Sequence, residues 1–149
     1  MRFKPNSTVA TIIEENGKFL FVEEIDQSRA VFNQPAGHLE ANETLIEAAK
    51  REVLEETGHQ CDITHYLGLY TYTAPSNGVT YHRHCFIGQS TYYDESLALD
   101  DGIIGIKWLT LEELIASNGA RSPLVIKCTQ DYLDGIRYPL NIIYEHPNE

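Results

Sequence analysis

The sequence predicts an α/β fold in which helices cover both faces of a mixed β-sheet. The main observation is the order of the predicted elements: β-rich runs precede a helix, further β-rich runs follow it, and two helices come last. Such an order describes a layered α/β domain. A length of 149 residues, with 42% hydrophobic residues, suits one hydrophobic core. We therefore expect residues 1–149 to form a single domain.

The strands are predicted from runs rich in β-branched and aromatic residues. Asn16-Gly17 joins the first two runs and is a strong hairpin signal. Ser76-Asn77-Gly78 marks a turn between two later runs. A loop at 35–42 follows the third run. The predicted strands cover residues 7–14, 18–24, 30–34, 62–73, 79–89 and 103–109.

Capping signals predict three helices. Thr44 and Glu47 have the form of a capping box, and Gly58 supplies a left-handed position that ends a helix. Similar signals predict a short helix within 110–119 and a longer one within 122–135. The first helix carries an apolar stripe at i, i+3 and i+7, which can pack on a sheet while acids face outward. The stripe consists of Ile46, Ala49 and Val53.

The first helix concentrates charge at Arg51, Glu52, Glu55 and Glu56. At about 100° per residue, the three acids share one helix face. Like charges so arranged repel unless a cation lies between them. Oxygen-only ligands favour Mg²⁺ or Mn²⁺, and Mg²⁺ commonly completes its shell with substrate phosphates. A solvated acidic helix face explains the cluster alone nearly as well.

The spacing around the cluster resembles the Nudix box, in which Gly, Glu and an Arg-Glu-aliphatic-any-Glu-Glu-any-Gly segment recur at fixed intervals. His59 is the one departure, because the family has an aliphatic residue there. His59 lies outside the acidic cluster, so this departure is expected to affect the packing after the helix and not the chemistry. The matching residues are Gly37, Glu43, Arg51, Glu52, Val53, Glu55, Glu56 and Gly58.

The resemblance implies an α/β/α sandwich and a metal-dependent hydrolysis of phosphoric anhydrides. It implies Mg²⁺, with Mn²⁺ as a substitute, held by Glu52, Glu55, Glu56 and the Gly37 carbonyl. Catalytic roles fall to Glu52, which is also a candidate base, to Glu55 and to Arg51. From the helical spacing, Arg51 is expected to pair with Glu47, and Glu43 is within reach.

An acid outside the box often serves as base in this superfamily. Glu40, Asp100 and Asp101 are the candidates here. The last two lie just before the 103–109 strand, and an ordinary Asp-Asp-Gly turn is an equally good interpretation.

Basic and aromatic residues are candidates for substrate binding. Arg83 lies on a strand with His82 and His84 on the opposite face, so it is either a bidentate phosphate clamp or an exposed strand residue. The two histidines lack a third ligand and are expected to be ordinary sheet residues. Weaker candidates for phosphate binding are Arg29, Arg121 and Arg137.

Aromatic residues give a second set of candidates. Most tyrosines of the 62–73 and 79–89 strands are expected to pack on the sheet, although stacking on a substrate base is the alternative. Trp108 is expected in the core. The tyrosines are Tyr66, Tyr70, Tyr72 and Tyr81.

Segments flanking the box resemble a bacterial phosphatase branch of the Nudix family. They lie at 31–40, 121–125 and 135–140. This resemblance implies hydrolysis of nucleoside di- and triphosphates and of hydroxymethylpyrimidine pyrophosphate, with release of phosphate. Phe32 stands where that branch has Trp, a change expected to affect stacking near the substrate base. The alternatives are ADP-ribose, a dinucleoside polyphosphate or a capped RNA end as substrate, or a non-catalytic module that senses nucleotides.

Composition limits the partners. A net charge of -11 repels extended nucleic acids, which makes them unlikely partners, but permits small phosphorylated substrates. Neither a long apolar run nor a secretory signal is present, so no membrane span and a cytoplasmic location are expected. Three scattered cysteines argue against both a disulfide framework and a zinc site. They are Cys61, Cys85 and Cys128. An oligomer is compatible with all of this.

Overall fold

The computed structural model describes residues 1–148 and contains the predicted elements together with one additional strand. The predicted loop at 35–42 contains this short strand, so that part of the prediction is wrong. A strand of three residues is too short to give a periodic signal. The elements in chain order are β1 (Asn6–Glu15), β2 (Lys18–Asp26), β3 (Arg29–Asn33), β4 (Ala36–His38), α1 (Leu45–Thr57), β5 (His59–Thr73), β6 (Thr80–Tyr93), β7 (Ile103–Leu109), α2 (Leu111–Ser117), α3 (Pro123–Leu133) and the 3-10 turn η1 (Leu140–Ile142).

The strands form a mixed sheet, as predicted. Its order is β3-β2-β1-β6-β5, with β4 paired to β1 and β7 paired to β2. Only β1 and β6 run parallel among the described strand pairs. Asn16 and Gly17 turn the chain with φ of 53° and 81°, and β1 then pairs with β2 at its last two residues, Glu14 and Glu15. The ladder between the two strands ends there, and β1 continues in pairs with β4 and β6.

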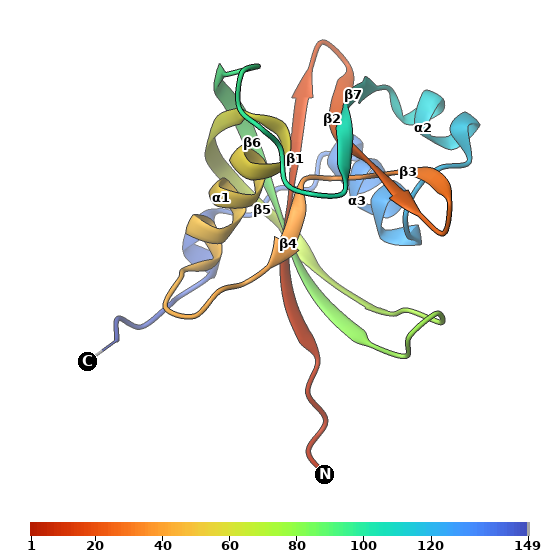
Figure 1. Cartoon of the computed structure of the whole chain (residues 1–149). Helices are drawn as coiled ribbons and strands as arrows, with labels where there is room; N and C mark the ends of the chain where they lie inside the picture. Colours follow the sequence, from red (N-terminus) through yellow and green to blue (C-terminus); the bar gives the residue numbers. More distant parts are fainter. Residues whose placement is uncertain (149) are drawn as a thin grey trace.

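Alternate residues of β1 fill two different layers. Ala10 and Ile12 belong to the cluster that includes residues of α2 and α3. Val9 and Ile13 lie in the two clusters that contain residues of α1. The period of two along a strand therefore puts α1 on one face and α2 with α3 on the other. Figure 1 shows this α/β/α arrangement, with α1 and α3 on opposite sides of the sheet.

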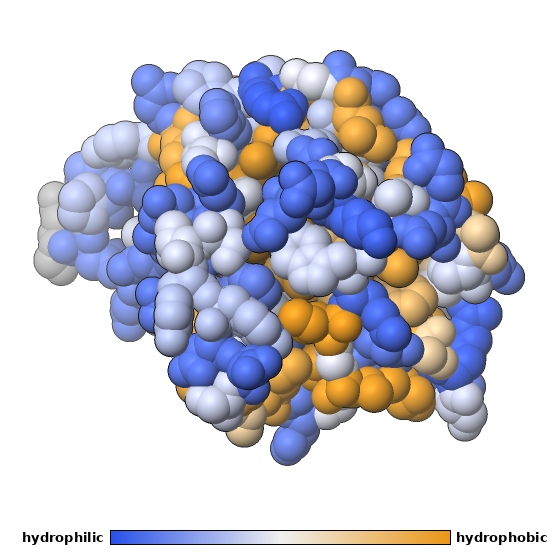
Figure 2. All heavy atoms as spheres, turned by 90° about the horizontal axis from the view of Figure 1, so that it is seen from above, coloured by the Kyte–Doolittle hydropathy of each residue, from blue (hydrophilic) through white to orange (hydrophobic). Residues whose placement is uncertain are grey.

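The surface is largely polar on the face shown in Figure 2. Figure 2 shows polar and charged side chains over most of one face, with apolar areas between them. The three cysteines are buried and free. Within residues 1–148, no helix combines the length and the apolar character that a membrane crossing requires.

Candidate active site

Helix α1 holds the acidic residues of the predicted site. Thr44 accepts a hydrogen bond from the Glu47 N–H, and the Glu47 carboxylate accepts one from the Thr44 N–H, which confirms the predicted capping box. Gly58 ends the helix at a φ of 78°, in the left-handed region that favours glycine. Both ends of α1 are fixed by local contacts, so the direction in which its side chains project is fixed as well.

Arg51 lies between acids of α1 and of the loop before it. Its Nε and Nη2 donate to the two carboxylate oxygens of Glu43 at 2.6 and 3.0 Å, and this pairing lowers the pKa of Glu43. Its Nη1 donates to Glu52 at 2.6 Å and to Glu55 at 3.3 Å. The expected pair with Glu47 is wrong, because that carboxylate caps the helix instead. One guanidinium thus orients three carboxylates.

Gly37 lies on β4 directly against the Glu52 carboxylate. A Cβ atom added to Gly37 would lie 2.2 Å from Glu52 Cδ. A side chain would fit there only if the Glu52 carboxylate moved, so glycine is what lets β4 approach α1 with that carboxylate in place. The register pairs Gly37 with Val9 of β1, which holds β4 in place. The backbone of Gly37 therefore borders the acidic cluster, while the role of its carbonyl as a metal ligand stays a prediction.

Burial alters the protonation of two acids on α1. Glu56 is buried, and its Oε1 accepts a hydrogen bond from the Ala36 N–H at 2.8 Å. Burial raises the pKa of Glu56 to about 8, although the bond from Ala36 opposes this effect. Burial also raises the pKa of Glu52, against the lowering effect of Arg51. A divalent cation would favour the charged form of both groups.

Three acids bring their oxygens close enough to share one cation. One carboxylate oxygen from each of Glu52, Glu55 and Asp100 lies within 4.8 Å of the others. The Asp100 N–H donates to the Glu55 carbonyl at 3.1 Å, which ties the loop before β7 to α1. This oxygen-only donor set fits a hard divalent cation. Glu56, a predicted ligand, lies outside this group of three and bonds Ala36.

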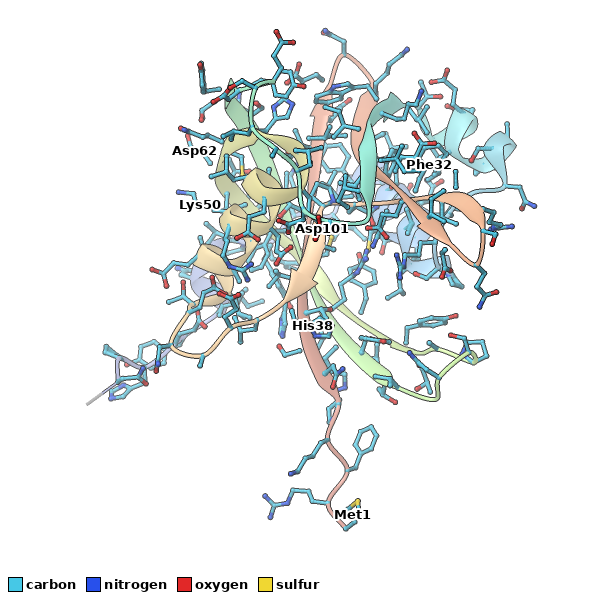
Figure 3. All side chains as sticks on the ribbon, in the orientation of Figure 1. Met1, Phe32, His38, Lys50, Asp62 and Asp101 are labelled. Carbon is cyan, nitrogen blue, oxygen red and sulfur yellow. The ribbon has the colours of Figure 1, made fainter. Side chains whose placement is uncertain are left out.

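The other two acids predicted outside the box are not part of this group. Glu40 is exposed, and its Oε1 lies 3.6 Å from the Nε of Arg51. Asp101 is exposed and lies between α1 and β7 in Figure 3. Of the three predicted acids, Asp100 is thus the one that the fold groups with Glu52 and Glu55.

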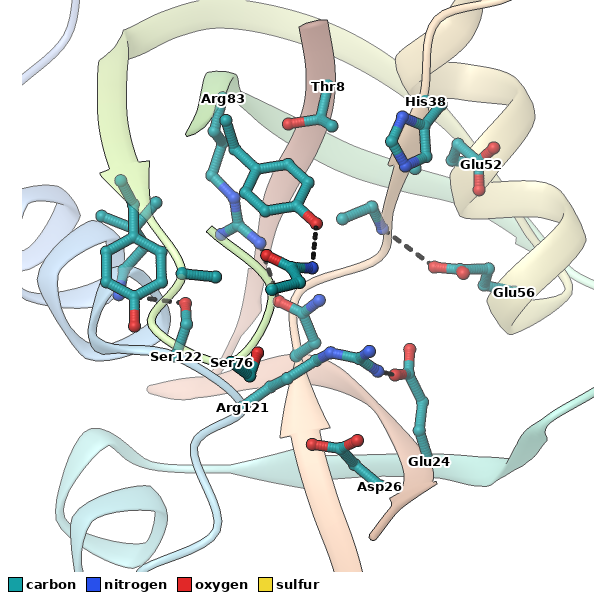
Figure 4. A pocket seen from close by; sticks show the side chains of 18 of the residues that line it. Thr8, Glu24, Asp26, His38, Glu52, Glu56, Ser76, Arg83, Arg121 and Ser122 are labelled. Carbon is teal, nitrogen blue, oxygen red and sulfur yellow. Dashed lines mark hydrogen bonds and ion pairs between the residues drawn. The ribbon is translucent and has the colours of Figure 1, made fainter. Parts of the chain in front are cut away.

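A hollow of about 900 Å³ adjoins the acidic helix. This volume falls in the range of roughly 300–1,000 Å³ that is usual for small-molecule sites. In Figure 4, Glu52 and Glu56 project from α1 on one side, and Arg83 projects from the opposite side. Gly37, His38 and further residues complete the wall next to the acids. These further residues are Glu24, Asp26 and Glu40.

Arg83 is buried and rigidly held. Its Nη1 donates to Gln34 Oε1 at 2.7 Å, and its Nη2 donates to Asn33 Oδ1 at 2.8 Å. Gln34 is itself fully buried and donates to the Val125 carbonyl at 2.9 Å and to Thr129 Oγ1 at 3.2 Å, both on α3. Among residues 1–148, Arg83 pairs with no carboxylate. Because its partners are neutral, its positive charge faces the hollow uncompensated.

Two predicted substrate-binding residues lie outside the hollow. Phe32 packs against the cluster beneath α2 and α3, and a Cβ on Gly119 would lie 3.1 Å from its ring. Figure 3 shows it on the side of α2. Arg29 borders a second, smaller hollow of about 400 Å³. The strand of Phe32 pairs with the chain at Ala120, and the effect of Phe32 on base stacking stays a prediction.

The remaining basic and imidazole candidates also have defined places. The Arg137 guanidinium lies 4.4 Å from the centre of the Tyr132 ring, away from the hollow. Arg121 lines the hollow and forms an ion pair with Glu24. His84 Nδ1 lies 3.0 Å from the Tyr66 hydroxyl, as expected for an ordinary sheet residue.

Sequence reasoning missed Asn33 and Glu24, which line the hollow, and Gln34, which holds Arg83 from behind it. It named Arg121 but not its ion pair with Glu24. Two successive amides at the end of a strand, next to the box, are a weak signal that could have suggested a polar anchor. The pair between Glu24 and Arg121 joins residues 97 positions apart and has no signal in the sequence.

Comparison with known proteins bears directly on this arrangement. The NUDIX domain family matches residues 3–127. This chain belongs to the Nudix family. Phosphatase NudJ of Escherichia coli is 40% identical over 141 residues, which cover 95% of this chain and 92% of NudJ. A solved Nudix hydrolase from Nitrosomonas europaea is 45% identical, with a TM-score of 0.94, over 98% of this chain and 100% of the other.

Nudix membership and the likeness to NudJ make this chain a hydrolase of phosphoric anhydride bonds that acts on a small phosphorylated substrate. They set aside the alternative of a non-catalytic sensor. An ADP-ribose pyrophosphatase from Streptococcus suis shares the fold at a TM-score of 0.67 over 97% of each chain, but at 14% identity. At that distance the likeness concerns the fold alone, because one fold hosts many activities.

Proposed function

We propose that this Nudix hydrolase is Mg²⁺-dependent, with Mn²⁺ as a substitute, and cleaves nucleoside di- and triphosphates and hydroxymethylpyrimidine pyrophosphate with release of phosphate. The observation that carries the proposal is the group formed by Glu52, Glu55 and Asp100, whose oxygens lie within 4.8 Å of one another beside the hollow. We further propose that residues 1–149 act as one domain. A cytoplasmic location and oligomeric assembly stay predictions.

Each acidic residue has a proposed role. Glu52, Glu55 and Asp100 would hold the cation, with Glu56 and the Gly37 carbonyl as further ligands on the buried side. A bound divalent cation supplies charge neutralisation on the phosphate oxygens and a water of lowered pKa. Glu52 is the proposed base, since its carboxylate faces the hollow and Arg51 fixes its orientation. Glu40 stays a second candidate, because it also lines the hollow.

Arg83 is the proposed phosphate-binding residue on the opposite side of the hollow. Phosphoryl transfer depends mainly on positioning and on neutralising charge. A guanidinium already held by Asn33 and Gln34 loses little freedom when a phosphate binds to its free N–H groups. The alternative, that Arg83 is an exposed strand residue, does not agree with its exposed fraction of 7%.

The substrates are proposed from the likeness to NudJ, which supports nucleotides and the pyrimidine pyrophosphate over other diphosphates. ADP-ribose and dinucleoside polyphosphates are the second candidates. The acidic surface disfavours a capped RNA end.

One experiment tests the function and the product together. The purified protein is incubated with Mg²⁺ and each of ATP, ADP, hydroxymethylpyrimidine pyrophosphate, ADP-ribose and a dinucleoside polyphosphate, and free phosphate is measured against pyrophosphate. We expect phosphate from the first three. Glu55→Gln should lower kcat by more than about 100-fold, which exceeds the loss typical of a group that only orients a metal ligand.

The matched control is Glu112→Gln, which removes an equal charge from an exposed position on α2. It should keep wild-type turnover. Undiminished phosphate release by a folded Glu55→Gln protein would refute the proposed site. Turnover of ADP-ribose alone would favour the second substrate class.

A further inference from the structure

The two walls of the hollow differ in chemistry. One wall carries the carboxylates of α1 and β4's backbone, as described above. The other comes from the β5–β6 hairpin and its turn, and it presents aromatic and neutral polar groups around Arg83. Phosphate groups alone would make no use of an aromatic surface. The residues of this second wall are Tyr72, Ala74, Pro75, Ser76, Asn77 and Tyr81.

Tyr72 and Tyr81 lie directly opposite each other in the β5–β6 ladder and both border the hollow. Their side chains are half-buried. The Tyr81 hydroxyl accepts a hydrogen bond from Asn77 Nδ2 at 3.2 Å, so the turn holds that ring in place. Within residues 1–148, the Tyr72 hydroxyl makes no hydrogen bond. Arg83 follows Tyr81 by two residues and therefore faces the same side of β6.

The neighbouring tyrosines of β5 are used differently. Tyr66 packs edge-on against Phe86 and lies within hydrogen-bond distance of His84. Tyr70 packs on the core beside α3 and donates to Asp131 at 2.8 Å. Both rings are therefore tied to the core, whereas Tyr72 and Tyr81 line the hollow.

We propose that Tyr72 and Tyr81 form a subsite that stacks on the aromatic ring of the substrate, a nucleobase or a pyrimidine, while Arg83 and the acidic wall take its phosphates. The inference rests on the proposed function and specifies which part of the substrate this site recognises, namely its aromatic ring. Tyr81 also lies beside His38, with ring centres 6.4 Å apart, and His38 follows Gly37 of the acidic wall. The aromatic wall is thus adjacent to the place where phosphate binds.

The subsite distinguishes two ligands that carry the same phosphates. ATP has an aromatic ring, whereas inorganic tripolyphosphate has none. Stacking between a base and an aromatic side chain, measured by alanine substitution, changes affinity by about tenfold or more. The wild-type protein should therefore bind ATP at least about tenfold more tightly than tripolyphosphate under the same Mg²⁺ concentration.

The test measures dissociation constants by calorimetry, and kcat/KM where turnover occurs, for ATP and for tripolyphosphate. Tyr72→Ala and Tyr81→Ala should each weaken ATP binding by about tenfold and leave tripolyphosphate unchanged. Tyr72→Phe should retain ATP binding, because stacking needs the ring and not the hydroxyl. Tyr92→Ala is the matched control, since Tyr92 is an exposed tyrosine that lies on β6, as Tyr81 does, but outside the hollow.

Equal losses for both ligands would reduce the tyrosines to a structural role and overturn the subsite. Equal wild-type affinities for ATP and tripolyphosphate would also overturn it. Absence of turnover for every substrate would refute the proposed hydrolysis of nucleotides, yet the binding ratio would still decide the subsite. The two failures are therefore distinguishable.

Discussion

At the scale of single residues, the site depends on a close approach between Gly37 and Glu52. The Nudix spacing predicted both residues, and the helix period predicted that Glu52 shares a face with Glu55. The sequence did not predict that Glu52 is 8% exposed and lies against the β4 backbone. That burial depends on β4, a strand too short to show periodicity, so only the tertiary structure reveals it.

Gly37→Ala is expected to impair catalysis more than folding. The added Cβ would displace the Glu52 carboxylate, and a misplacement of about 1 Å can cost about 100-fold in rate. Overpacking of this kind typically costs about 1–3 kcal/mol of stability. Steady-state kinetics, with thermal unfolding to check folding, would measure both effects.

Gly105→Ala is the control for that substitution. A Cβ at Gly105 on β7 would meet nothing within 4 Å. This variant should match the wild type in both measurements. If Gly37→Ala kept wild-type kcat, the close approach of Gly37 to the Glu52 carboxylate would not be needed for catalysis.

At the scale of elements, the junction of α1 and β5 explains the one departure from the box. His59 is 5% exposed, and its ring stacks on Tyr93 at 4.4 Å and meets Trp108 edge-on at 5.8 Å. Its Nδ1 lies 2.7 Å from Ser90 Oγ. An aromatic surrounding accepts a neutral imidazole where relatives have an aliphatic side chain. The prediction that this departure concerns packing agrees with the position of His59.

Burial lowers the pKa of His59 below its ordinary value of 6.5, and Glu15 only partly opposes this. As pH falls below about 6.5, the unfolded chain therefore takes up a proton that the folded protein resists, and stability is lost. His59→Leu should remove this contribution. We expect the variant to lose less stability than the wild type between about pH 7.5 and about pH 5, as measured by urea unfolding.

His65→Leu, at a half-buried position of the same strand, serves as the comparison, because any effect of losing a histidine that is not specific to position 59 should appear in both variants. The slope of stability against pH is the quantity to compare, since His59→Leu also loses the contacts with Ser90 and Tyr93. An unchanged slope in His59→Leu would show that another group causes the acid sensitivity.

At the scale of the whole molecule, the fold brings the loop before β7 to the acidic helix. Asp100 is 45 positions from Glu55 in the chain, and their backbones are joined by a hydrogen bond of 3.1 Å. The sequence predicted Asp100 and Asp101 equally as candidates for the additional acid. Only the path of the loop separates the two, because adjacent side chains on a turn point in different directions.

Mg²⁺ should stabilise the folded protein through this group of acids. At a concentration about 100-fold above the dissociation constant, binding contributes about 2.7 kcal/mol, which corresponds to a rise in Tm of about 5 to 10 °C for a chain of this size. Asp100→Asn should reduce the rise, whereas Asp101→Asn should preserve it. Differential scanning calorimetry with and without Mg²⁺ would measure both variants.

Equal effects of Mg²⁺ on the two variants and the wild type would indicate general screening of a chain with a net charge of -11. In that case the group of acids would not be a specific site. Repeating the titration with Na⁺ at equal ionic strength separates screening from binding.

The sequence by itself determined α1, its caps and its acids, because these depend on contacts between residues three to four positions apart. It also determined the layered α/β class through the order of its elements. The tertiary structure decided that Arg51 pairs with Glu43, that Asn33 and Gln34 hold Arg83, and that Phe32 packs against the core. These contacts require distant segments to meet, and local periodicity carries no information about which distant side chains then face each other.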